Sequence, residues 1–309
     1  MNHWIKAFRL RTLPLSFSNI LLGSALAYSF EKGESTGGFS RKIFALTLLT
    51  TLLLQILSNL ANDYGDAKKG ADNENRIGPE RAIQSGAISP KAMLNAIILV
   101  SVLALISGVA LLYFSFKNNL SWTFAGFFVL GILAIVAAIK YTVGKKAYGY
   151  SGLGDVFVFI FFGWVGVAGS FYLQTHHFNL FILLPATTMG CFSVAVLNLN
   201  NMRDQVNDKA VGKNTLVVKV GAKNAKIYHG ILFVVAYLAF PIPLIFISGG
   251  NLLHLIPIVP VFIIHLIHLV KVYKICDPKD FDPELKKIAL SAFLFSILFW
   301  ASIILEIKM

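Results

Sequence analysis

Long apolar segments separated by short polar ones make up most of the chain. Nine of these segments approach the roughly 20 residues that a helix needs to cross a bilayer. They lie at residues 13–30, 43–61, 93–116, 122–139, 153–174, 180–199, 228–248, 252–270 and 288–305. The pattern predicts an all-α protein, a polytopic membrane bundle of about nine transmembrane helices in one domain over residues 1–309. Prolines between 241 and 260 leave the seventh and eighth segments open to a kink or break.

Composition supports this class. The chain has 309 residues, 56% of them hydrophobic, and a mean hydropathy of +0.71, which excludes an ordinary soluble domain. Cys191 and Cys276 form neither a disulfide framework nor a metal motif. The net charge of +12 comes from basic residues dispersed among short loops, so nucleic acid is not an expected partner.

The basic residues predict the orientation of the bundle. If the N-terminus is cytoplasmic, 22 of the 27 Lys and Arg residues fall on that side and 5 on the other. This bias matches the positive-inside rule. Residues 1–12 are basic and amphipathic and predict an interfacial helix. We therefore expect an integral protein of a bacterial cytoplasmic (inner) membrane.

Two segments rich in Asp and Asn follow apolar runs on the predicted cytoplasmic side. They are NLANDYGDAKKGAD at 59–72 and NLNNMRDQVND at 198–208, and they hold five of the fifteen acidic residues. Asn62-x-x-x-Asp66 in the first recurs as Asn200-x-x-x-Asp204 in the second. Because the two helices run in the same direction four spans apart, the recurrence indicates a parallel duplication of a four-helix unit.

The spacing within these segments predicts a divalent-metal site. Residues four apart share a helix face, so each segment presents amide and carboxylate oxygens on one stripe. Mg²⁺ prefers such ligands and is commonly held by one or two carboxylates together with substrate phosphates. Acids at a helix C-terminus also meet the negative end of the helix dipole, which a cation between them would relieve. The alternative is that both segments are solvated, salt-bridged loop ends.

Four stretches of the chain, in order, resemble one known family. They are RLRTLPLSFSNILLG at 9–23, NDYGDAKKGADNENRIGPERAIQSGAIS at 62–89, YTVGKKAYGYSGLGD at 141–155 and NNMRDQVNDKAVGKNTLVVKVG at 200–221. In these the chain resembles the UbiA-type intramembrane prenyltransferases. Within them it is most similar to the 1,4-dihydroxy-2-naphthoate polyprenyltransferases of menaquinone biosynthesis. Gly70 stands where many relatives carry an acid, and the resulting D-x-x-x-G-x-D form favours the naphthoate branch, although Ala147 replaces an expected Pro.

The resemblance implies a chemistry and a set of ligands. It implies a lipid-open cavity and Mg²⁺-dependent transfer of a prenyl group from a polyprenyl diphosphate to 1,4-dihydroxy-2-naphthoate. Attack at the carbon that bears the carboxylate, with loss of CO₂ and diphosphate, would give demethylmenaquinone in its reduced, quinol form. The residues expected to bind the metal and support catalysis are Asn62, Asp66, Asp72, Asp204 and Asp208. Asn200 and Asn201 are expected to bind substrate, Asn201 as the position that matches the second family motif.

Other polar residues have two interpretations each. Arg76 and Arg81 could bind the diphosphate or only set topology, whereas Arg203 is expected to orient Asp204. Other candidates for substrate binding, which could equally be anchors at the membrane interface, are Arg11, Tyr141, Tyr150 and Asp155. His265 and His268 share a helix face with no acid or Cys nearby in sequence, and we interpret them as structural.

Two further functions compete with this one. A cation-coupled transporter would also need intramembrane acids on repeated helices, but the outer halves of the predicted spans carry no acid to complete a pathway. Within the prenyltransferase class, the acceptor could instead be a hydroxybenzoate, a haem precursor or a chlorophyll precursor.

Overall fold

The computed structural model describes residues 2–34, 38–117, 119–241, 255–256 and 258–306. Regular structure in these residues is entirely helical, which confirms the all-α prediction. The α-helices are α1 (Asn2–Phe8), α2 (Leu13–Glu34), α3 (Arg41–Lys68), α4 (Pro90–Phe116), α5 (Trp122–Lys140), α6 (Gly154–Val158), α7 (Gly169–Thr175), α8 (Leu183–Ala210), α9 (Leu216–Ala239), α11 (Val259–Lys274) and α12 (Phe281–Glu306). Shorter or non-α segments are η1 (Leu10–Thr12), η2 (Tyr148–Tyr150), η3 (Phe159–Ala168), η4 (Leu180–Ile182) and η6 (Pro278–Asp280).

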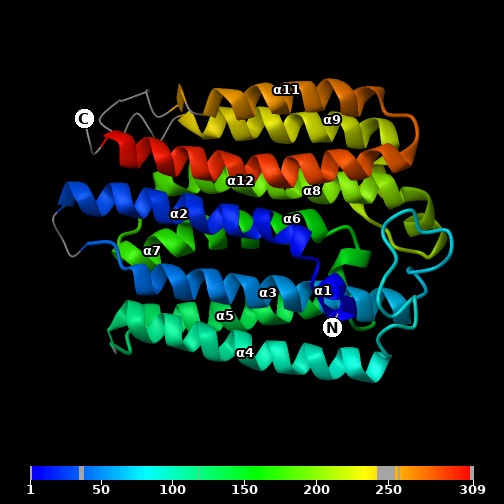
Figure 1. Ribbon diagram of the computed structural model, residues 1–309, viewed down its shortest axis with the longest axis horizontal. Coiled ribbons are helices and arrows are strands. Elements are labelled where there is room, and N and C mark those ends of the chain that lie inside the picture. The colour runs from blue at the N-terminus through cyan, green and yellow to red at the C-terminus, as the bar shows by residue number, and fades with distance from the viewer. Residues whose placement is uncertain (1, 35–37, 118, 242–254, 257, 307–309) are drawn as a thin grey trace.

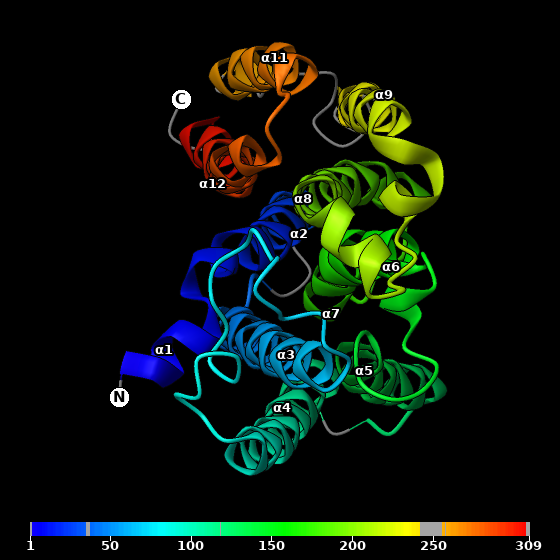
Figure 2. The same cartoon turned by 90° about the vertical axis from the view of Figure 1, so that its right-hand side faces the viewer.

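The long helices lie side by side along the longest axis of the molecule (Figure 1). Viewed along that axis, α3, α4 and α5 form one group and α8, α9, α11 and α12 form a second (Figure 2). Helices α2, α6 and α7 lie between the two groups. Loops 69–89, 141–153, 211–215 and 275–280 collect at the same end of the bundle as α1 (Figure 1). The loops that the sequence assigns to one side of the membrane therefore share one end, and the identity of that side as the cytoplasm stays a prediction.

Among the described residues, seven segments are long and apolar enough to cross a membrane. They are Leu13–Glu31, Arg41–Lys68, Pro90–Phe116, Trp122–Lys140, Gly154–Thr175, Leu180–Ala210 and Pro278–Leu305. The predicted segments 228–248 and 252–270 overlap α9 and α11, but residues 242–254 and 257 lie outside the described residues. The total of nine spans therefore stays a prediction. So does the duplication, although α3 and α8 do run in the same direction (Figure 1).

The interfacial helix expected at residues 1–12 is α1 followed by the short turn η1. Ala7 is buried, and Trp4 and Phe8 pack against the apolar cluster that includes Leu57 and Leu60 of α3. The apolar face of α1 is therefore docked on the bundle itself. Arg9, between α1 and η1, has a left-handed backbone with φ of 49°, which turns the chain into α2.

A group of buried polar contacts joins the C-terminal helices α9, α11 and α12. His229 Nε2 on α9 lies 2.9 Å from His268 Nε2 on α11, and His268 Nδ1 lies 2.6 Å from Glu284 Oε2 on α12. His265 lies between two hydroxyl groups, each 2.7 Å from a ring nitrogen. Both predicted structural histidines are thus hydrogen-bonded. The expectation that no acid accompanies the pair was wrong for His268, because Glu284 reaches it from a different helix.

Helix α8 crosses the span formed by α6, η3 and α7 at two glycines. A Cβ atom on Gly163 of η3 would lie 2.6 Å from the carbonyl oxygen of Ala186, and one on Gly190 of α8 would lie 2.8 Å from the ring of Phe159. Backbone approach this close requires glycine on both sides of the crossing. The crossing matters for function because α8 carries the second acidic segment.

We expect Gly163→Ala to destabilise the protein by about 1–3 kcal/mol, because the added methyl group meets backbone atoms that cannot move independently. The measurement is the thermal unfolding midpoint of the detergent-solubilised protein. Gly126→Ala on α5 is the matched control, since a Cβ atom there meets nothing within 4 Å. An unchanged midpoint in Gly163→Ala would show that the crossing tolerates a wider separation.

Candidate active site

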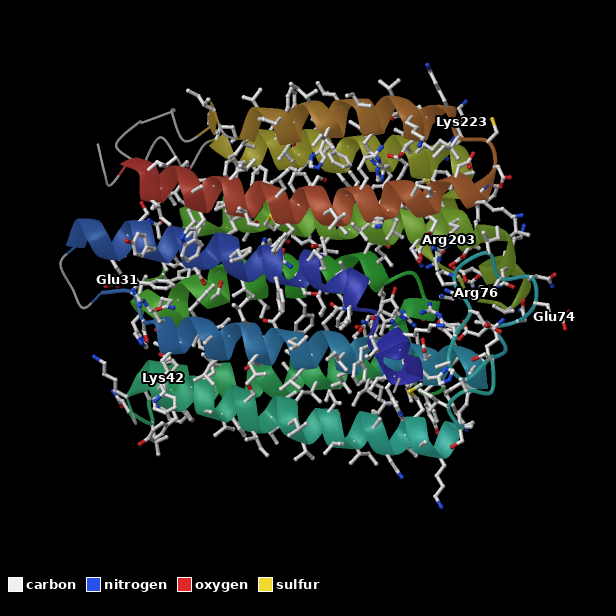
Figure 3. All side chains as sticks on the ribbon, in the orientation of Figure 1. Glu31, Lys42, Glu74, Arg76, Arg203 and Lys223 are labelled. Carbon is white, nitrogen blue, oxygen red and sulfur yellow. The ribbon has the colours of Figure 1, made fainter. Side chains whose placement is uncertain are left out.

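A cavity of about 420 Å³ lies between α2, α3, α4, α5, η3 and α8. At the loop end of the bundle its lining consists largely of charged and amide side chains from both acidic segments and the loops that follow them. These are Arg9, Asn62, Asp66, Asp72, Arg76, Arg81, Asn200, Asn201, Arg203, Asp204, Asp208 and Lys213. Labelled side chains in Figure 3 show Arg76 and Arg203 close together at this end, with Glu74 directed away from the bundle. The two segments, which are far apart in sequence, therefore meet at one cavity.

The first acidic segment lies on the last turns of α3 and the start of the next loop. Asp66 is buried, and its Oδ1 accepts a hydrogen bond of 2.8 Å from the Tyr150 hydroxyl. The Oδ1 of Asn62 accepts one from Thr142 at 3.3 Å. Asp72 lies beyond the end of the helix, where its Oδ1 is 3.2 Å from Arg76 Nε. The helical stripe thus positions Asn62 and Asp66, and the loop brings Asp72 to the same cavity.

The second acidic segment lies on the last three turns of α8. Arg203 holds Asp204 with two donors, Nε to Oδ1 at 2.9 Å and a terminal nitrogen to Oδ2 at 2.7 Å. The same guanidinium donates to Asn200 Oδ1 at 2.7 Å. Asp208 lies 3.4 Å from Lys213 Nζ. Asn201 is also buried in the lining.

Arginines of loop 69–89 connect the two segments. Arg76 pairs with Asp72 of the first segment and lies 3.9 Å from Asp204 of the second. Arg81 lies 3.7 Å from the Asp72 carboxylate. A Cβ atom on Gly78 would lie within 2.8 Å of the guanidinium groups of both Arg76 and Arg203, so these two side chains pack directly on that glycine. The loop therefore places cations between the two sets of acids.

Of the remaining predicted residues, some lie at the cavity and others do not. Tyr141 lines the cavity, and Tyr150 contacts it through Asp66 while Lys69 Nζ lies 3.8 Å above the Tyr150 ring. Asp155 is buried but is not among the cavity-lining residues in the described part of the chain. The side chain of Arg11 lies outside the described residues, so its role stays a prediction.

Three charged residues of this region were not predicted as site residues. Arg9 lines the cavity and pairs with Asp63, which also lies 3.3 Å from Arg81. Lys213 follows α8 and reaches back to Asp208. Arg9 and Lys213 do lie within the family-like stretches, which is the one signal that could have selected them. Their pairing depends on turns that sequence periodicity does not describe.

The pKa values of three loop residues are shifted by burial and by neighbouring charges of both signs. Burial raises the pKa of Asp72 to about 6, with Arg81 opposing the shift and the Asp66 carboxylate adding to it. Burial lowers the pKa of Arg81 to about 10. Burial also acts to lower the pKa of Lys213, but Asp66, Asp208 and Asp204 outweigh it and the pKa lies above its usual value. Lys213 therefore responds to acids from both segments.

Some carboxylate oxygens of the site have no hydrogen-bond partner in the described chain. The Oδ1 of Asp72 has only its ion-pair contacts with Arg76 and Arg81, and the Oδ2 atoms of Asp72 and Asp208 are buried with no hydrogen-bond partner in the described chain. Buried carboxylate oxygens without donors favour a cation, so these residues fit Mg²⁺. Among the described residues, no group of three or more His, Cys, Asp or Glu is arranged to hold a metal alone. The arrangement is suited to a metal that takes its other ligands from a bound phosphate group.

Deeper in the cavity, the walls differ in character. Segment η1 and helices α2 and α3 contribute a polar wall, whose members include Thr12, Ser16, Asn19, Gln55, Ser58 and Asn59. Helix α5 and segment η3 contribute an apolar one, which includes Phe127, Phe128, Leu130, Phe161, Phe162 and Val165. A ligand with an anionic head, an apolar chain and a polar ring has a matching surface for each part.

Comparison with known proteins identifies relatives of the whole bundle. The profile of the UbiA prenyltransferase family matches residues 20–303. The chain is 51% identical over 242 residues to a 1,4-dihydroxy-2-naphthoate octaprenyltransferase of Haemophilus influenzae, which covers 77% of each chain. It is 49% identical to the protein of that name in Escherichia coli, covering 74% of this chain and 72% of the relative. The Mycobacterium tuberculosis protein of that name is 33% identical, covering 77% and 76%.

Two solved structures share the fold. A UbiA homologue from Aeropyrum pernix superposes with a TM-score of 0.68 at 15% identity, covering 97% of this chain and 99% of the other. A structure described for digeranylgeranylglyceryl phosphate synthase superposes with a TM-score of 0.63 at 16% identity, covering 98% and 99%. At this identity the likeness establishes the helical architecture alone.

Proposed function

The chain belongs to the UbiA prenyltransferase family, and we propose that it transfers a polyprenyl group from a polyprenyl diphosphate to 1,4-dihydroxy-2-naphthoate. The acceptor is supported by relatives at 49–51% identity that carry this activity in their names. The observation that carries the proposal is the meeting of the two acidic segments around one cavity with polar, cationic and apolar regions. We place the protein in a bacterial cytoplasmic membrane with this site at the cytoplasmic edge.

The donor's diphosphate binds at the charged end of the cavity. Arg76 and Arg81 present guanidinium groups there, and planar guanidinium donors suit phosphate oxygens. Arg203 is fully engaged with Asp204 and Asn200, so its role is to hold that carboxylate in place. The polyprenyl chain lies against the aromatic wall of α5 and η3 and continues towards lipid.

Mg²⁺ bound with the diphosphate would neutralise charge and make the diphosphate a better leaving group. Asp66, Asp72, Asp204 and Asp208 would hold it, directly or through water, with Asn62 and Asn201 beside them. Because the acids come from two helices, both segments must be in place at once. Tyr150, which donates to Asp66, fixes the orientation of that carboxylate.

The reaction requires no nucleophile from the protein. The bond between the prenyl C1 and the diphosphate oxygen breaks, and its electron pair leaves with the diphosphate. The acceptor carbon that bears the carboxylate attacks the allylic cation, and loss of CO₂ returns an electron pair to the ring. The protein contributes position and electrostatics, which supply most of the rate in such reactions.

A cation-coupled transporter is disfavoured by where the acids lie. The acidic and basic groups of the cavity cluster at the loop end, whereas its deeper walls carry hydroxyl, amide and apolar groups. A second proposal within the class, transfer to a hydroxybenzoate, shares the donor site and differs only at the acceptor.

The test is an assay of the purified, detergent-solubilised protein with octaprenyl diphosphate and either 1,4-dihydroxy-2-naphthoate or 4-hydroxybenzoate. We expect the prenylated naphthol as the only product. It should form with Mg²⁺, should not form in the presence of a chelator, and should form again when Mg²⁺ is added back. Carboxyl-labelled acceptor should release one labelled CO₂ for each product molecule. Product from hydroxybenzoate alone would overturn the acceptor, and product in the presence of chelator would overturn the metal.

A further inference from the structure

The polar wall of the cavity extends beyond the reach of the diphosphate site. Thr12, Ser16 and Asn19 lie four and three residues apart, so they share one face of η1 and α2. Across from them, Gln55 lies two turns of α3 before Asn62. All of these residues line the cavity. A hydrocarbon tail forms no hydrogen bonds, so the binding of the prenyl chain does not explain this polar surface.

Most of these groups satisfy one another. Ser16 Oγ donates to Gln55 Oε1 at 2.5 Å. The Nε2 of Gln55 donates to Thr12 Oγ1 and to Asn59 Oδ1, each at 3.3 Å. Asn59 donates in turn to Thr12 and to the carbonyl oxygen of Phe8. These contacts form a closed network that joins α2 to α3.

Asn19 stands apart from that network. It is 2% exposed, and its Oδ1 is buried with no hydrogen-bond partner in the described chain. The residue is held close to η3, because a Cβ atom on Gly166 would lie 3.2 Å from Asn19 Cβ. A buried carbonyl oxygen without a donor is costly, and such groups in native proteins usually serve a ligand or water.

The hydrogen-bond donors of the reactants indicate which reactant Asn19 binds. An amide oxygen accepts hydrogen bonds, so it cannot bind the diphosphate oxygens, which are also acceptors. The polyprenyl chain offers no donor. Asn19 lies two turns of α2 beyond Thr12, which contacts Asn59, so it lies deeper than the acidic residues that would hold the metal. Of the reacting groups in the proposed function, only a ring hydroxyl of the acceptor can donate a hydrogen bond to Asn19.

We propose that Asn19 Oδ1 accepts a hydrogen bond from a hydroxyl of the aromatic acceptor and thereby selects a dihydroxylated ring. This assignment rests on the proposed function, because it takes a hydroxynaphthoate as the ligand. The ring lies along the wall of α2 and α3, and the prenyl chain lies on the apolar wall opposite. A site built to bond a substrate hydroxyl discriminates strongly against analogues that lack it.

The experiment compares equilibrium binding of 1,4-dihydroxy-2-naphthoate, 1-hydroxy-2-naphthoate and 4-hydroxy-2-naphthoate to the full-length, detergent-solubilised protein without donor. The wild-type protein should bind the dihydroxy compound roughly 10- to 100-fold more tightly than at least one monohydroxy analogue. Asn19→Leu should bring that ratio near one while binding of diphosphate with Mg²⁺ is unchanged. Asn19→Asp, which keeps an oxygen in place, should retain the preference. If Asn19→Leu does not accumulate, Asn19→Ala gives the same comparison without added bulk.

Ser101→Ala is the control, since the hydroxyl of Ser101 on α4 bonds to Ile97 of its own helix and Ser101 is not among the cavity-lining residues. It should leave the ratio unchanged. A preference that survives in Asn19→Leu, or a wild-type protein that does not distinguish the analogues because water satisfies the amide, overturns the assignment and leaves the proposed function standing. Failure of the wild-type protein to bind any of the three naphthoates would instead overturn the proposed acceptor, and Asn19's role with it.

Discussion

Asp66→Asn and Asp204→Asn should each lower turnover by about 100-fold or more while the protein still inserts into the membrane. Each change removes one negative charge from the cavity with almost no change in shape. The expected loss is of the size seen when one preorganised electrostatic contact to a transition state is removed. Asp66→Asn is the cleaner variant, because an amide oxygen can still accept the hydrogen bond from Tyr150.

The measurement is the initial rate of prenylated product at saturating donor, normalised to folded protein. Asp280→Asn is the matched control, since Asp280 is an exposed acid at the same end of the bundle. It should keep the wild-type rate. Near-normal turnover in both Asp66→Asn and Asp204→Asn would contradict the site.

Arg203→Met should destabilise the protein by about 3–5 kcal/mol, the usual result of removing one partner from a buried ion pair. The side chains of Arg203 and Asp204 are only 2% and 6% exposed, so the carboxylate left behind cannot be solvated. Its nearest remaining cation is Arg76 at 3.9 Å. We expect a fall in the thermal unfolding midpoint on the order of 5 °C or more, together with a loss of activity.

The other partner of the same guanidinium provides the comparison. Asp282 also pairs with Arg203, but its side chain is 41% exposed. Asp282→Asn should therefore cost about 1 kcal/mol or less, as exposed ion pairs do. Equal destabilisation in the two variants would show that Arg203 acts by tying α12 to α8 and not by supporting Asp204.

Features that depend on helix periodicity could be predicted from sequence. The apolar runs predicted the long helices, although several boundaries moved outward, as when 43–61 became Arg41–Lys68. The four-residue spacing placed Asn62 with Asp66 and Asn200 with Asp204, because a helix fixes which side chains share a face. The family resemblance was confirmed by the match over residues 20–303.

Features that depend on how loops and helices pack against each other could not be predicted. The pairing of Arg9 with Asp63 requires the left-handed turn at Arg9, which nothing in the residue type demands. Asp155 lies in the first turn of α6 in a family-like stretch, yet its side chain is buried and is not among the cavity-lining residues. Glu284 joins His268 across two helices, a contact that depends on their relative register and not on spacing in the chain.

We propose that both acidic segments bind one metal–diphosphate unit together. Binding of Mn²⁺, as a spectroscopic substitute for Mg²⁺, should be measured by electron paramagnetic resonance with and without inorganic diphosphate. In the wild-type protein, diphosphate should strengthen Mn²⁺ binding, and either Asp66→Asn or Asp204→Asn should abolish the effect. Full retention of the effect in either variant would mean that one segment suffices, which would contradict the claim.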